Sequence, residues 1–98
     1  MNIRLRGLGY KMTVADLPRN IWGECDPPIY KRREIRLSPS LTDDKKLLEI
    51  IIHECLHGCC WDIDEEVVKE TSADIAKVLH RLGARVNLEG KVKPKRKR

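Results

Sequence analysis

The stretch LLEIIIHECLHGC, residues 47–59, decides the fold of this 98-residue chain, because its apolar residues recur with helical spacing. On a helical wheel, His53 and His57 fall opposite the apolar arc, beside Lys46 and Ile50. Residues four apart lie one turn above each other on a helix, so the two imidazoles can point at one ion. We therefore expect a helix that packs its apolar half against a sheet and turns both histidines toward a cleft. The apolar arc consists of Leu47, Leu48, Ile51, Ile52, Cys55, Leu56 and Cys59.

Within this helix the pentapeptide HECLH, residues 53–57, has the HExxH spacing of zinc-dependent hydrolases. In that arrangement the two histidines bind the metal, and the glutamate takes a proton from the metal-bound water. A helix that merely carries two histidines and a surface glutamate is the simpler alternative. Buried imidazoles need partners, however, and these two lie in a stretch with buried character. The motif therefore predicts a zinc site, with His53 and His57 as ligands and Glu54 as the general base.

A second helix is expected after a short connection at residues 59–63. Asp62 or Asp64 is its expected N-cap, and Gly83 is its expected C′ residue. Because the connection is so short, the two helices should be antiparallel neighbours. The expected apolar stripe of the second helix consists of Val68, Ile75, Leu79 and Leu82.

A third metal ligand should come from this second helix. With a rise of about 1.5 Å per residue, position 70 returns alongside position 53, and position 66 alongside position 57. Catalytic zinc sites use three protein ligands plus an open position, so Glu70 is the expected third ligand and Glu66 the next candidate. Asp74, one turn after Glu70, is placed to accept the second N–H of a ligating imidazole. The alternative for Glu70 is a solvated helix face in an acid-rich segment.

Four segments before the first helix have the character of strands. Residues 2–6 and 10–15 alternate apolar and polar side chains across a glycine-containing turn. Residues 21–25 and the end of residues 29–37 form an expected hairpin around two prolines. Thr42 is the expected N-cap of the first helix. The predicted fold class is α+β, with a small antiparallel sheet followed by two antiparallel helices that carry the metal site.

The net charge of +5 is concentrated at one end of the chain. Residues 91–98, KVKPKRKR, hold six basic groups, and the other residues hold 14 Lys and Arg against 15 Asp and Glu. Such a run is typical of a disordered, self-repelling segment. It favours either a solubilising terminus or weak, nonspecific binding of nucleic acid through phosphate contacts.

The remaining composition narrows the class of protein. No uninterrupted run of the most apolar residues is longer than residues 50–52, so no membrane partner is expected. The first residues lack the apolar core of a secretory signal, which favours a cytoplasmic protein with free thiols. Cys55, Cys59 and Cys60 cluster near the histidines and leave a thiol site as an alternative. Cys55 lies on the apolar arc, which favours a place in the core.

HECLH followed by ETSAD at residues 70–74 resembles the HExxH and ExxxD pair of the gluzincin clan of zinc metallopeptidases. The length and short spacing are similar to those of minigluzincins and of small SprT-like metallopeptidases encoded in phages. The segments WGECD, residues 22–26, and EIRLSP, residues 34–39, are similar to the region before HExxH in those phage proteins. The resemblance covers most of residues 10–83.

The resemblance implies a metallopeptidase domain over residues 1–88, followed by a basic tail at residues 89–98, in a phage-encoded protein of the host cytoplasm. It implies zinc ligands at His53, His57 and Glu70, with Glu54 as the general base and Asp74 in support. One departure is that larger gluzincins have a longer gap between the two motifs. They also supply a Tyr or His that stabilises the oxyanion, and the groups of that kind here are Tyr10, Tyr30 and His80.

The expected substrate is a peptide or protein, which would pair with the edge of the sheet along residues 29–37. Two other function classes remain open. A noncatalytic zinc-binding domain would keep the ligands without needing Glu54. A nucleic-acid-associated protein would depend on the basic tail and would bind less tightly as salt is added.

Overall fold

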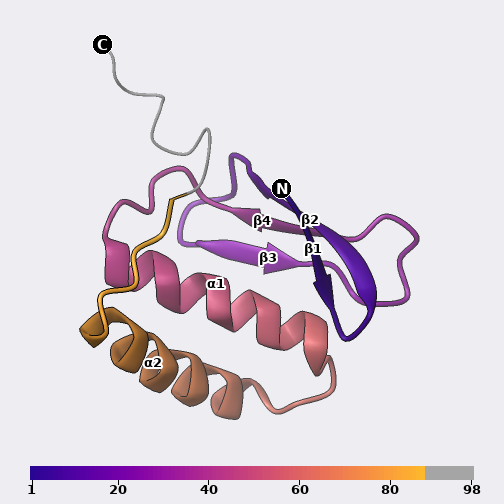
Figure 1. The fold of residues 1–98 in the computed structure, drawn as a ribbon. Coiled ribbons are helices and arrows are strands. Elements are labelled where there is room, and N and C mark those ends of the chain that lie inside the picture. Colours follow the sequence, from indigo (N-terminus) through magenta and orange to yellow (C-terminus); the bar gives the residue numbers. More distant parts are fainter. Residues whose placement is uncertain (88–98) are drawn as a thin grey trace.

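The computed structural model of the protein describes residues 1–87 and has an α+β fold, as predicted. Four strands are followed by two helices, and helix α1 lies between the sheet and helix α2 (Figure 1). The elements are β1 (Asn2–Leu5), β2 (Leu8–Val14), β3 (Gly23–Cys25), β4 (Glu34–Leu37), α1 (Asp44–Cys59) and α2 (Glu65–Arg81).

The sheet is mixed, whereas the sequence analysis predicted an antiparallel sheet. Its strand order is β1-β2-β4-β3, and β4 pairs in parallel with β2 and antiparallel with β3. The chain leaves β2, passes along the outer edge as β3, and then turns back to insert β4 between them. Because β3 runs opposite to β2 and the hairpin reverses the chain again, β4 runs in the same direction as β2. The expected hairpin of β3 and β4 is confirmed. Strand β2, however, pairs with β4 and not with β3, the next strand along the chain.

Turn residues explain where the strands begin and end. Strand β1 turns into β2 at Arg6 and Gly7, which have positive φ angles of 51° and 84°. The predicted strand at residues 29–37 is shorter, because residues 26–33 form a loop that includes two prolines. Arg33 holds this loop on the sheet, since its guanidinium donates to the Tyr30 carbonyl at 2.7 Å and to the Gly9 carbonyl at 3.0 Å.

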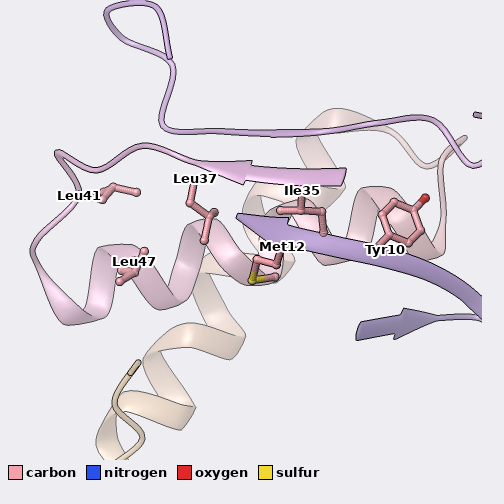
Figure 2. Packing of buried hydrophobic residues seen from close by; sticks show 6 residues of the cluster. All are labelled: Tyr10, Met12, Ile35, Leu37, Leu41 and Leu47. Carbon is pink, nitrogen blue, oxygen red and sulfur yellow. The ribbon is translucent and has the colours of Figure 1, made fainter. Parts of the chain in front are cut away.

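The main core lies between the sheet and α1 (Figure 2). Ile35 and Leu37 point from β4 toward α1, which carries Leu47, and all three side chains are fully buried. The polar residues that alternate with them, Glu34 and Arg36, are half-buried. This alternation is the period-2 pattern that the sequence showed for the end of this segment. The core also contains Tyr10, Met12 and Leu41.

Helix α1 occupies the predicted stretch, but both of its expected ends were wrong by one residue. Asp43 is the N-cap and accepts a hydrogen bond from the Lys46 amide at 2.8 Å, a role that the sequence analysis gave to Thr42. The connection was expected to begin at residue 59, but Cys59 is still helical and Gly58 lies inside the helix. A Cβ at Gly58 would collide with Leu5, so the glycine lets the β1–β2 hairpin approach the helix.

Helix α2 packs on α1 with smaller side chains than expected. Its N-cap is Asp64, and Gly83 has a φ of 95° as the predicted C′ residue. Val68, Ser72 and Ala76 are its buried residues. The predicted stripe is correct at Val68 and wrong at Leu82, which is 77% exposed. Small side chains at consecutive turns let the two helix backbones lie close together.

The predicted basic tail at residues 89–98, and with it the predicted boundary at residue 88, lies outside the described residues. In the part of the chain that the structure describes, no helix is long and apolar enough to cross a membrane.

Candidate metal centre

Helix α1 presents His53 and His57 on the same side, one turn apart. Their Nε2 atoms lie 3.2 Å from each other. The carboxylate of Glu65, the first residue of α2, lies against both rings, with one oxygen 3.2 Å from Nε2 of His53 and the other 3.0 Å from Nε2 of His57. Among residues 1–87 these three side chains form the one group of three metal-ligating residues whose ligand atoms come together.

The spacing of these atoms suits a small metal ion. Ligand atoms about 2.0–2.2 Å from a tetrahedral zinc ion lie about 3.3 Å from one another. The two Nε2 atoms lie 3.2 Å apart, and each lies 3.0 or 3.2 Å from a different oxygen of Glu65. With one ligand atom from each residue, all three atoms lie within 4.8 Å of one another. Two imidazole nitrogens and a carboxylate are also a ligand set that catalytic zinc sites use. The residues present therefore fit zinc in both geometry and chemistry.

The two imidazoles are largely buried, and the environment of His53 favours its neutral ring. The side chains of His53 and His57 are 16% and 20% exposed, and that of Glu65 is 57% exposed. Burial lowers the pKa of His53 below its ordinary value, although the charge of Glu65 opposes that shift. Neutral imidazole has the free nitrogen lone pair that a metal requires. Trp61 packs edge-on against His57, with ring centroids 6.1 Å apart.

The other acids that the sequence analysis named on α2 do not join this group. Glu70, the expected third ligand, is exposed, and so are Glu66, the next candidate, and Asp74, the expected support. Glu70 lies five residues after Glu65, which on a helix is about 7.5 Å along the axis and about 140° around it. One rigid helix therefore cannot turn both of these carboxylates toward the two imidazoles.

Sequence reasoning missed Glu65 because its position has an adequate local explanation. Acidic residues are favoured in the first turn of a helix, where they interact with the helix dipole. The predicted pairing of positions 53 with 70 and 57 with 66 also assumed that the two helices run symmetrically away from the middle of the connection. The structure instead places the very start of α2 beside the His53–His57 turn. The signal that was available is the run Asp64-Glu65-Glu66 directly after the short connection.

Glu54, the expected general base, is the most buried acid of the site. It is 7% exposed, and its carboxylate makes no hydrogen bond to any residue in 1–87. Burial, assisted by the negative charges of Glu65 and Glu24, raises the pKa of Glu54 to about 7. Gly23 of β3 passes directly over it, because a Cβ at Gly23 would lie 3.2 Å from a Glu54 carboxylate oxygen. Burying a carboxylate costs free energy unless another group at the site pairs with it.

A cleft of about 660 Å³ opens beside the metal-ligating group. We call it the histidine cleft. Of the three residues considered for oxyanion stabilisation, only Tyr30 lines it; Tyr10 is buried in the core, and His80 lies at the far end of α2. The lining residues are Glu24, Cys25, Asp26, Pro27, Tyr30, Arg36, His57, Trp61, Ile63 and Glu65.

The free edge of the sheet beside this cleft is β3. The sequence analysis placed peptide pairing along residues 29–37, but β4 is bonded on both sides and has no free edge. The carbonyl of Trp22 and the amide of Asp26 bond toward β4. Because alternate residues of a strand point in opposite directions, the backbone groups of Gly23 and Cys25 point away from β4. This outer edge runs along the histidine cleft.

Two of the cysteines, Cys25 and Cys55, are poorly suited to a second chemical site. Cys55 packs against the main core, as expected, and burial raises its pKa to about 11. Burial, with the charge of Glu54 next in importance, raises the pKa of Cys25 to about 12. Both thiols therefore stay protonated at neutral pH, and a protonated thiol is a poor nucleophile and metal ligand.

Comparisons of the chain with protein-family models, with curated proteins and with solved structures find no match. A functional assignment therefore depends on the geometry of the His–His–Glu group and its cleft.

Proposed function

We propose that this protein is a zinc-dependent metallopeptidase whose metal ligands are His53, His57 and Glu65. The observation that carries the proposal is the convergence of these side chains beside the buried carboxylate of Glu54: the two Nε2 atoms lie 3.2 Å apart, and each contacts one of the two Glu65 oxygens at 3.0 or 3.2 Å. The resemblance of HECLH to the gluzincin motif supports the same activity. The proposal differs from that resemblance in one respect, because the sequence analysis favoured Glu70 as the third ligand.

The chemistry divides between the bound ion and the chain. A zinc ion held by three protein ligands supplies a water with a pKa of about 7 and polarises a carbonyl oxygen. Glu54 accepts the proton of the attacking water and returns it to the leaving amine. Its burial supports this role, because a base shielded from bulk solvent exchanges its proton with the reacting groups. Tyr30, at the cleft wall, is the residue best placed to donate a hydrogen bond to the oxyanion.

An extended peptide is the substrate that the edge of β3 suits best. The outward amide and carbonyl groups of Gly23 and Cys25 can pair with a peptide main chain, which would add a strand to the sheet. Such a strand would run past the metal ligands along the histidine cleft. Trp61, Pro27 and Ile63 supply apolar surface there for side chains of the substrate.

The first test is metal content. Purified wild-type protein should hold one zinc per chain by elemental analysis, and His57→Ala should not. His80→Ala is the matched control, because His80 is also half-buried on a helix but lies far from the group. Zinc retained at full stoichiometry by His57→Ala would overturn the proposed site.

The second test separates a peptidase from a noncatalytic zinc-binding domain. Glu54→Gln should keep zinc and lose peptide hydrolysis, because the amide cannot accept the proton. The loss should be at least about a hundredfold, the lower range for a general base. Wild-type protein loaded with zinc should cleave an unstructured protein such as casein. Equal cleavage by Glu54→Gln would exclude the general-base role.

A further inference from the structure

Residues 1–87 divide into two parts of opposite charge. Residues 1–36, which include the whole sheet except Leu37, hold eight Lys and Arg against four Asp and Glu, a formal charge of +4. Residues 37–87, which form the helices, hold six Lys and Arg against ten Asp and Glu, a formal charge of −4. Because these two charges cancel, the net charge of residues 1–87 does not reveal that the sheet is positively charged.

Arg36 takes up most of the negative charge of the sheet. Its guanidinium forms ion pairs with Glu24 at 3.0 Å, with Asp26 at 2.6 Å and with Glu34 at 3.0 Å. Residues 1–36 contain seven other Lys and Arg residues. Asp16 is the one acid of this part that Arg36 does not pair with. Within residues 1–87 none of those seven forms an ion pair, which leaves their charges available to an external anion.

Five of these seven cations gather around one hollow of about 700 Å³, which we call the basic cleft. Its lining residues come from β1, β2, the β3–β4 loop and the first residue of β4, and none of them lines the histidine cleft. Gly9, which has no side chain, lies opposite Arg4 in the strand pairing and leaves the floor of the hollow open. The five cations are Arg4, Lys11, Lys31, Arg32 and Arg33.

The basic cleft is held in place by the fold. Arg33 is bonded to the carbonyls of Gly9, Pro28 and Tyr30, and the Lys11 amide donates to the Arg33 carbonyl at 2.9 Å. These bonds fix the β3–β4 loop to β2 and bring Lys31 and Arg32 to the same hollow as Lys11. Lys11, Lys31 and Arg32 are exposed and make no side-chain hydrogen bond to residues 1–87.

We propose that the basic cleft binds the phosphodiester backbone of nucleic acid, independently of the basic run at residues 91–98. A concave surface with five cations suits a narrow polyanionic chain, and phosphate contacts dominate such binding. A membrane surface suits it poorly, because the apolar residues of the cleft, Ile3 and Tyr10, are half-buried and buried and cannot insert into lipid. Binding of this kind is independent of base sequence.

The test uses the full chain and two triple variants of equal charge. One variant, Lys11→Gln with Lys31→Gln and Arg32→Gln, removes free cations of the basic cleft. The matched control, Lys45→Gln with Lys69→Gln and Lys77→Gln, removes three exposed cations from the helices. Both keep the whole basic run, and both should unfold at the wild-type temperature. The probe is a short fluorescein-labelled single-stranded DNA, followed by fluorescence anisotropy over a series of salt concentrations.

The basic-cleft variant should bind the DNA at least about tenfold more weakly than the control at low salt. The slope of log affinity against log salt should become less steep by about 2, since each lost phosphate contact removes about 0.7. Equal affinity of the two variants would overturn the proposal and assign all binding to residues 91–98. Anionic phosphatidylserine vesicles, bound through the same three residues while DNA binding is unaffected, would overturn it in favour of a membrane.

Discussion

Helix α1 packs against different partners on its two long sides, and the two interfaces are built from different side chains. Toward the sheet it meets Ile35, Leu37 and other large apolar residues that are completely buried. Toward α2 it meets Val68, Ser72 and Ala76, and the neighbouring residues Val67 and Ile75 are about 40% exposed. The sheet side therefore provides most of the apolar burial, and the α2 side mainly positions one carboxylate beside the two imidazoles.

The largest effect on stability should follow truncation on the sheet side. Leu37→Ala removes a fully buried side chain from a rigid strand, and we expect the free energy of unfolding to fall by about 2–5 kcal/mol. Urea unfolding followed by circular dichroism measures this loss. Val78→Ala on the exposed face of α2 is the control and should change stability by less than about 0.5 kcal/mol. Similar losses in the two variants would mean that the sheet side does not dominate stability.

The largest effect on the α2 side should be on metal binding. Glu65→Ala should weaken zinc affinity by more than about a hundredfold, because even indirect supports of a metal ligand are worth 10–100-fold. Glu66→Ala removes an acid from the same first turn and should change affinity by less than about threefold, the scale of a helix-dipole contribution. Competition with a fluorescent zinc chelator measures the zinc affinities of the wild-type protein and of the two variants. A collapse in Glu70→Ala, with Glu65→Ala unaffected, would restore the ligand that the sequence favoured.

The charged cluster on the sheet should make stability depend on pH. Hydrogen bonds from Arg36, together with one from the Glu34 amide, lower the pKa of Asp26 below its ordinary value. Asp26 therefore stabilises the fold above its unfolded pKa of about 3.9, and this contribution is lost as the pH falls through the lower folded pKa.

Asp26→Asn should remove this acid-dependent part. At pH 7 the variant should be less stable by about 1.5–3 kcal/mol, the usual range for a hydrogen bond to a charged group. Its difference from wild type should shrink below pH 4. Asp16→Asn, an exposed acid of residues 1–36, is the control. Urea unfolding between pH 7 and below pH 4 measures this difference in stability. A difference that stayed constant with pH would contradict the stabilising role of the Asp26 carboxylate.

A smaller effect should follow from widening the interface between the helices. Ser72 is fully buried, and its hydroxyl bonds to the Lys69 carbonyl of its own helix. Ser72→Leu should cost about 1–3 kcal/mol by overpacking. It should also weaken zinc binding, because it pushes the start of α2 away from α1. Ser72→Ala keeps the spacing and should retain zinc affinity. Full zinc affinity in Ser72→Leu would show that Glu65 is positioned by the connection alone.

Much of this protein followed from local patterns in the sequence. The apolar period of residues 47–59 predicted α1, and the i, i+4 spacing placed His53 and His57 on one side of it. Asp64 was one of the two expected N-caps of α2, and Gly83 was its expected C′ residue; both are confirmed because capping depends on a few neighbouring atoms. The hairpin of β3 and β4 is of the same local kind.

Only the tertiary structure decided which distant residues meet. The parallel pairing of β2 with β4 joins segments about twenty residues apart, and no local pattern encodes the order of strands in a sheet. The choice of Glu65 over Glu70 beside the histidines depends on how closely α2 packs on α1, which the small residues Ser72 and Ala76 determine. The basic cleft depends likewise on the loop that Arg33 fastens to β2. The sequence determines which chemical groups the side chains carry, whereas tertiary packing determines which of these groups come together.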